Sequence, residues 1–266
     1  MPGRSVAERY RFELRLLLDA MYWRSGTDLR HLSPQRVTTV IEALREEMGL
    51  QTLTALTERL VHNDHDVQRV LDALQICLSE PKPDVGGDAL MIDHWRNHVV
   101  PLLRSTPFPS VWVHDCGDAA LRAHLFAMLD ECDLLQRCTV FVTCTETSTV
   151  ALLRQQMQQA LPMRAGQCCT NLIVAEYNIH TDGTFNEFDF ILCGTVLRRL
   201  ASATQRRVMR LLGESLTPCG VLQLLAPDAA DAARIAPIFL PMDDGVPLYR
   251  HALLERHAQR RRHALR

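Results

Sequence analysis

The sequence predicts an α/β protein in which a doubly wound, mostly parallel sheet follows a small all-α domain. Two patterns support this prediction: the first part of the chain has helical periodicity, and apolar runs of strand length then alternate with helical runs. A third observation is the apolar run Phe188–Cys193, which is typical of a central strand buried on both faces. Ligands in such folds bind at the carboxyl ends of the strands, so the chemistry is expected around Cys193, Gly194 and Thr195.

The first part, residues 1–105, is expected to form a helical bundle and a linker helix. Its first helix starts near Val6 and ends at Gly26; the second begins with Ser33 as its cap and Pro34 in its first turn, and stops at Gly49. A loop rich in proline and glycine precedes the last of three further helices, which are expected over Leu53–Leu60, Val67–Leu78 and Met91–Leu103.

The second part, residues 106–250, is expected to hold the sheet, with the domain boundary near Thr106. Helices are predicted over 119–135 and 148–161. An antiparallel closing pair, Ile238–Leu240 with Val246–Tyr249, is expected around the turn Asp243-Asp244-Gly245. The other strands are predicted at Ser110–His114, Thr139–Thr143, Asn171–Ala175, Phe188–Cys193 and Gly220–Leu225.

Composition excludes several classes of function. The formal net charge of -2 gives no general attraction to nucleic acid or membrane, and an aromatic content of 6% disfavours an RNA-recognition surface. No run approaches the roughly 20 apolar residues that a membrane helix needs, and the N-terminus lacks a secretory apolar core. A cytoplasmic location is therefore expected.

A basic tail, residues 251–266, follows the sheet. From Arg250 onward the chain has six arginines and one glutamate. A solvated basic helix or a frayed terminus explains this composition, and the alternative is a site for an anionic partner or a nucleotide.

The nine cysteines form no C-x-x-C pair and lie mostly in apolar surroundings, so we expect buried, reduced thiols. Three of them, together with His124, are the nearest approach to a zinc site, but their spacing fits no common ligand pattern: Cys132, Cys138 and Cys144. No metal site is predicted.

Two long segments carry a resemblance to a known family. "NLIVAEYNIHTDGTFNEFDFILCGTVL", followed by "ATQRRVMRLLGESLTPCGVLQLL", resembles the closing half of the chemotaxis receptor glutamate methyltransferases, the CheR family. "FELRLLLDAMYWRSGTDLRHL" resembles the start of that family's helical N-terminal domain. The resemblance covers Phe12 to Leu225. It implies a Rossmann-like methyltransferase sheet, S-adenosylmethionine as cofactor and a receptor glutamate as substrate.

The family's cofactor loop, similar to "AGCSTGEEVYS", corresponds to His114–His124 here, and only Cys116 keeps its identity. Asp115 replaces the first glycine and Gly117 follows. A Cβ at a position that needs a positive φ costs about 1 kcal/mol, so the turn is predicted to change shape. Asp118 is interpreted as the cap of the helix that follows.

Other cofactor contacts of the family are replaced as well. The acidic ribose partner in "ATDIN" becomes Cys144, with Glu146 two residues later as a candidate substitute. In the linker, Ser79 replaces a threonine. Asn178 keeps the asparagine of "HNL", either as a cofactor contact or as a turn residue. In "CRNVLIYF" the arginine and asparagine become Gly194 and Thr195.

These losses favour a catalytically degenerate CheR-like protein, without catalytic residues or a bound cofactor, that acts as a binding or regulatory module in bacterial signalling with a protein partner. The alternative is an active protein-glutamate O-methyltransferase that uses S-adenosylmethionine. The degenerate cofactor positions are Ser79, Asp115, Gly117, Cys144, Glu146, Asn178, Gly194 and Thr195.

Arginines gather after the central strand, at positions 198, 199, 206, 207 and 210. A solvated helix face explains them. Arg198 and Arg199, however, are expected near the crevice, where they are candidates for binding a phosphate or carboxylate, for example of a cyclic dinucleotide.

Overall fold

The computed structural model describes residues 5–78, 88–145, 147–160, 171–194, 196–225, 235, 237–242 and 246–252. It divides into two compact units. The first comprises Met1–Pro81 with Arg199–Thr204, and the second comprises Lys82–Arg198 with Gln205–Arg266. Each unit is described by itself below.

The first unit is an all-α bundle, as predicted. Its helices are α1 (Val6–Ser25), α2 (Pro34–Glu47), α3 (Leu53–His62) and α4 (Asp64–Leu78). Apolar side chains at helical spacing meet in one core, which includes Leu17, Met21, Ile41, Leu56, Leu60 and Val70. These buried side chains supply the main stabilisation of helices too short to be stable alone.

Local signals fix the ends of these helices. Ser5 and Glu8 form a capping box at the start of α1, and Gly26 ends that helix in the left-handed conformation with a φ of 72°. Gly49 has a φ of 67° after α2. Ser33 is the N-cap residue of α2 and Pro34 lies in its first turn, as predicted. The Ser33 side chain makes no cap hydrogen bond, and the Ser33 backbone N–H donates to the carbonyl of Arg199 at 2.8 Å.

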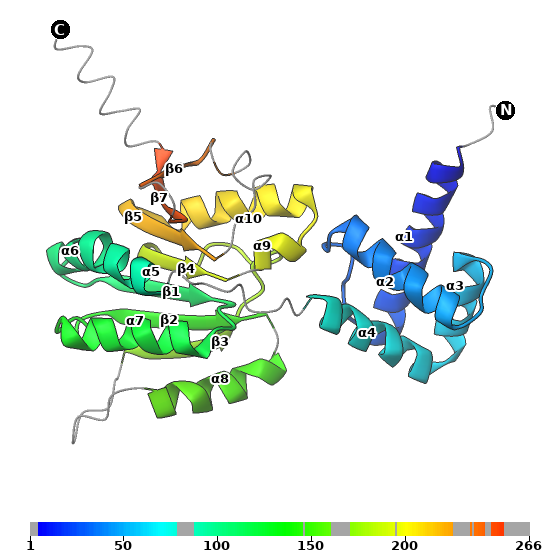
Figure 1. The fold of residues 1–266 in the computed structure, drawn as a ribbon, viewed down its shortest axis with the longest axis horizontal. Helices are drawn as coiled ribbons and strands as arrows, with labels where there is room; N and C mark the ends of the chain where they lie inside the picture. The colour runs from blue at the N-terminus through cyan, green and yellow to red at the C-terminus, as the bar shows by residue number, and fades with distance from the viewer. Residues whose placement is uncertain are drawn as a thin grey trace, which may run out of the picture. The chain divides into compact units, whose positions relative to one another are not determined.

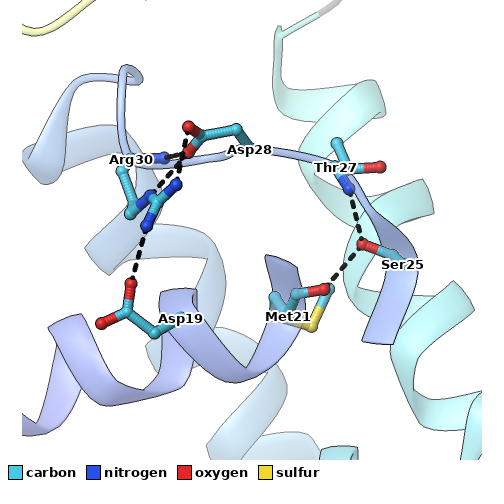
Figure 2. A network of polar contacts seen from close by, with 6 residues as sticks. All are labelled: Asp19, Met21, Ser25, Thr27, Asp28 and Arg30. Atoms are coloured by element: carbon cyan, nitrogen blue, oxygen red, sulfur yellow. Dashed lines mark hydrogen bonds and ion pairs between the residues drawn. The ribbon is translucent and has the colours of Figure 1, made fainter. Parts of the chain in front are cut away.

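A polar network holds the chain that leaves α1 (Figure 2). The Arg30 guanidinium donates to both carboxylate oxygens of Asp28 at 2.9 Å and to Asp19 of α1 at 3.1 Å. The Ser25 hydroxyl donates to the Met21 carbonyl and accepts from the Thr27 N–H. These bonds orient the segment after α1.

The second unit contains one sheet of seven strands in the order β3-β2-β1-β4-β5-β7-β6 (Figure 1). The pairs among β1 to β5 are parallel, and β7 pairs antiparallel with both β5 and β6. The strands are β1 (Ser110–His114), β2 (Thr139–Cys144), β3 (Leu172–Glu176), β4 (Phe188–Cys193), β5 (Leu216–Leu224), β6 (Phe239–Pro241) and β7 (Leu248–His251).

β4 lies in the middle of this sheet and all six of its residues are buried, as predicted for the central strand. β5 begins at Leu216, four residues before the predicted Gly220. The predicted antiparallel closing pair is present as β6 and β7. Its expected turn, Asp243-Asp244-Gly245, lies outside the described residues, and so does the tail beyond Ala252.

Helices pack on the sheet and position its carboxyl edge. They are α5 (Asp88–His94), the π-helical turn η1 (Trp95–Val99), α6 (Val100–Ser105), α7 (Ala119–Glu131), α8 (Thr147–Ala160), α9 (Val196–Arg199) and α10 (Ser202–Glu214). Side chains of α5 to α8 share one core with alternate residues of the strands, among them Val111, Val113, Phe190 and Leu192. At the edge of the sheet formed by β7 and β6, Gly213 of α10 lies close to Phe239 of β6 and His251 of β7.

The predicted domain boundary near Thr106 is wrong. The units separate after Pro81, and residues 88–105 belong to the sheet unit. Trp95 explains this assignment: its ring meets Phe190 of β4 edge to face, with centroids 5.9 Å apart, and its Nε1–H donates to Gln223 of β5 at 3.2 Å. The tail also begins later than predicted, because His251 is the last residue of β7.

Within the described part of the chain, no helix combines the length and apolar character that crossing a membrane requires.

Candidate functional site

The candidate site lies at the carboxyl edge of the parallel strands. Because β1, β2 and β4 run parallel, their last residues His114, Cys144 and Cys193 reach the same edge. Backbone hydrogen bonds continue beyond the strand ends. The Asp115 N–H donates to the Thr143 carbonyl at 2.9 Å, and the Gly194 N–H donates to the His114 carbonyl at 2.8 Å. The strand ends are therefore tied to one another by the main chain.

Asp115, the first residue after β1, adopts the left-handed conformation with a φ of 48°. The sequence predicted that a side chain in place of glycine changes the shape of this turn. Asp115 nevertheless has a positive φ, and the change of shape stays a prediction. Aspartate is one of the few residue types that tolerate the left-handed region, although at a cost of about 1 kcal/mol. Asp115 thus bears a backbone strain that glycine would avoid.

Gly194, the first residue after β4, touches the backbone of this turn. A Cβ added at Gly194 would clash with the Asp115 carbonyl oxygen, would lie 2.6 Å from the Asp115 carbonyl carbon, and would lie 3.1 Å from the Cys116 nitrogen. The resemblance places an arginine of the family here. No side chain fits at position 194, because the turn after β1 fills the space that it would need.

Asp118 and Gly117 complete the turn. The Asp118 carboxylate accepts the N–H groups of Ala120 at 2.9 Å and Leu121 at 3.2 Å, so the predicted helix cap is confirmed. A Cβ at Gly117 would meet nothing within 4 Å. Close approach of the backbone therefore does not require glycine at that position.

Arg122 of α7 supports the turn after β1 from the core side, and the sequence did not predict this role. Its side chain is buried, its Nη1 donates to the Cys116 carbonyl, and its Nη2 donates to Gln156 of α8 at 2.7 Å. Its Nε has no hydrogen-bond partner in the described structure. An arginine between Ala120-Leu121 and Leu125-Phe126, on the apolar side of a helix, was the signal that could have identified it.

The cysteines at this edge are buried thiols. Cys116, Cys144 and Cys193 are each 5% exposed or less. Burial raises the pKa of Cys116 to about 11, and burial together with nearby Asp115 raises the pKa of Cys193 further. The neutral thiol is a poor nucleophile, so neither Cys116 nor Cys193 is suited to covalent catalysis.

The expected ribose partner is absent at the end of β2. Cys144 faces the apolar core shared with α7 and α8, and a thiol there offers no charged acceptor to a ribose hydroxyl. Glu146, the candidate substitute, lies outside the described residues, and so do Ser79, Thr195 and the side chain of Arg198.

Asn178 organises a turn after β3. Its side-chain oxygen accepts the His180 N–H at 3.2 Å, its carbonyl accepts the N–H groups of Thr181 and Asp182, and its own N–H donates to the Asp182 carboxylate at 2.8 Å. Of the two roles that the sequence left open, the turn residue is the one seen here.

An aromatic and histidine cluster lies beside β1. The Thr143 hydroxyl accepts the Trp112 Nε1–H at 2.8 Å and contacts His114 Nδ1 at 2.9 Å. The tautomer of His114 sets which group donates in this contact, and its Nε2 is buried without a hydrogen-bond partner among the described residues. The ring of Tyr177 meets both Trp112 and His114 edge to face. Burial, with a contribution from His180, lowers the pKa of His114 to about 3.

The anion site expected at Arg198 and Arg199 stays a prediction, because the Arg198 side chain lies outside the described residues. The carbonyl of Arg199 accepts the Ser33 N–H, and Arg199 groups with the first unit. Arg207 of α10 donates to the Thr181 carbonyl at 3.2 Å. Among the side chains that the structure describes, no three His, Cys, Asp or Glu residues gather as metal ligands would.

The described residues at this edge do not fit S-adenosylmethionine in the arrangement that the resemblance implies. The turn after β1 is packed against Gly194, the second strand ends without an acid, and the Asn178 side-chain oxygen is used within its own turn. Ligands in this fold bind at the same edge.

No protein-family model matches the sequence. A protein of Pseudomonas putida named "Putative methyltransferase Cher3" is 27% identical over 262 residues, which cover 86% of this chain and 93% of that protein. Two solved structures align at lower similarity. The N-methyltransferase NodS from Bradyrhizobium japonicum, in complex with S-adenosyl-L-homocysteine, has a TM-score of 0.45 and 13% identity over 68% of this chain and 97% of its own. An S-adenosylmethionine-dependent methyltransferase from Clostridium acetobutylicum has a TM-score of 0.39 and 12% identity over 69% and 66%.

The fold assignment rests on the sheet rather than on those two scores. The parallel strands β3-β2-β1-β4-β5, with the antiparallel β7 between β5 and β6, agree with the Rossmann-like sheet that the resemblance implies, and the position of β7 differs from the order of the dinucleotide-binding fold. The chain is thus a protein of methyltransferase fold, and over most of its length it is similar in sequence to a CheR-like methyltransferase.

Proposed function

We propose that this chain is a CheR-like protein whose cofactor site has closed, and that it acts as a binding or regulatory module in bacterial signalling. One observation carries the proposal: the Asp115 carbonyl occupies the space next to Gly194, where the resemblance places a cofactor-holding arginine. A methyltransferase gains most of its rate from positioning the methyl group and the nucleophile, and a filled crevice removes that positioning.

Two further observations support the proposal. Burial keeps the thiols of Cys116 and Cys193 protonated by raising their pKa, so these side chains supply no negative charge to a sulfonium cofactor. In addition, Arg122 fixes the Cys116 carbonyl from within the core, which stabilises the turn in its closed form.

An active S-adenosylmethionine-dependent protein-glutamate O-methyltransferase is the second candidate. The similarity to the Pseudomonas putida protein favours it, because that similarity spans 86% of this chain and the relative is named as a methyltransferase. This candidate requires the turn after β1 to move away from Gly194, and an acid such as Glu146 to reach the ribose.

The partner of the favoured module is proposed to be a cytoplasmic signalling protein. An anionic nucleotide at Arg198 and Arg199 is a further proposal. Its basis is the arginine-rich sequence after β4, which offers planar, charged donors suited to phosphate.

Calorimetric titration of the purified full chain with S-adenosylmethionine, and separately with S-adenosylhomocysteine, tests the proposal. No heat is expected at high micromolar protein. Micromolar binding of either compound would reject the closed site, and a methyl-transfer assay with receptor fragments would then test the second candidate. Titration with a cyclic dinucleotide, compared with Arg199→Ala, tests the arginines separately.

A further inference from the structure

We draw no further inference here: the strongest candidate, the exposed apolar stripe of Phe12, Leu16 and Trp23 on α1 with the groove beside it against α3, carries nothing, because nothing in the structure shows what covers it.

Discussion

Asp115 and Gly194 approach each other closely at the carboxyl edge of β1 and β4. The Asp115 carbonyl occupies the space that a side chain at position 194 would need. The Gly194 N–H donates a hydrogen bond to the carbonyl of His114. The sequence identified both positions as altered, because each replaces a residue of the family. It could not reveal that the two alterations meet, because they lie far apart in the chain and are brought together by the pairing of β1 with β4.

Replacing Gly194 with alanine is predicted to destabilise the protein by about 3 kcal/mol or more, because the added Cβ strikes main-chain atoms that cannot rotate away. Gly183→Ala is the matched control, since a Cβ at Gly183 meets nothing within 4 Å and its unfolding free energy should change by less than about 1 kcal/mol. Urea unfolding measures both variants. Equal stability of the two would show that the contact at Gly194 is absent in solution.

His114 is predicted to make stability depend on pH. Its pKa is about 3 in the folded protein and about 6.5 when unfolded, so between these values the unfolded chain binds more protons. The unfolding free energy should therefore fall as pH drops below 6.5, with a contribution of up to about 1.4 kcal/mol per pH unit. Urea unfolding between pH 5 and 7 should show a shallower slope for His114→Gln. Parallel curves for the two proteins would contradict this account.

At the scale of elements, the turn after β1 depends on α7. Arg122 reaches from the first turns of that helix to the Cys116 carbonyl and to Gln156 of α8, so a single side chain links the turn to two helices. The strands and most helix spans were predicted correctly, since burial on both faces and alternation leave a clear record in the sequence. The buried position of Arg122 was not predicted, because a charged residue in a helix ordinarily points to solvent.

Arg122→Met is predicted to cost about 1 to 3 kcal/mol, since the Cys116 carbonyl loses its donor in a buried place. Arg96→Ala is the matched control, because the pair of Arg96 with Glu131 is exposed on both sides and should contribute less than about 1 kcal/mol. Hydrogen exchange of the amides at 115–118 should also quicken in Arg122→Met alone. Unchanged exchange in that turn would refute the supporting role of Arg122.

At the scale of the whole molecule, the chain consists of two units whose division the sequence placed too late. A loop rich in proline and glycine was visible before residue 88, but the helix predicted over residues 91–103 was counted with the first part of the chain, as a linker helix. Only the tertiary contacts of Trp95, with Phe190 and Gln223, show that this helix belongs to the sheet. Hydrophobic periodicity indicates that a helix has an apolar side. It does not indicate which of the two cores that side packs into.

Truncation tests this division. A chain that starts at Lys82 is predicted to retain a cooperative unfolding transition, because it keeps the helix that covers β4. A chain that starts at Thr106 loses Trp95, Val99 and Leu103 from the core and is predicted to aggregate or to unfold without cooperativity. Thermal unfolding followed by circular dichroism compares the two. Comparable cooperative transitions would return the boundary to Thr106.

The central claim is that the carboxyl edge between β1 and β4 is closed to S-adenosylmethionine. Backbone amide NMR signals of Asp115 to Asp118 and of Gly194 report directly on that edge, and they detect even weak binding. On addition of S-adenosylhomocysteine to millimolar concentration, the account predicts that these signals stay in place. Shifts of the same amides that saturate with ligand concentration would contradict it, since the turn would then open and admit the cofactor.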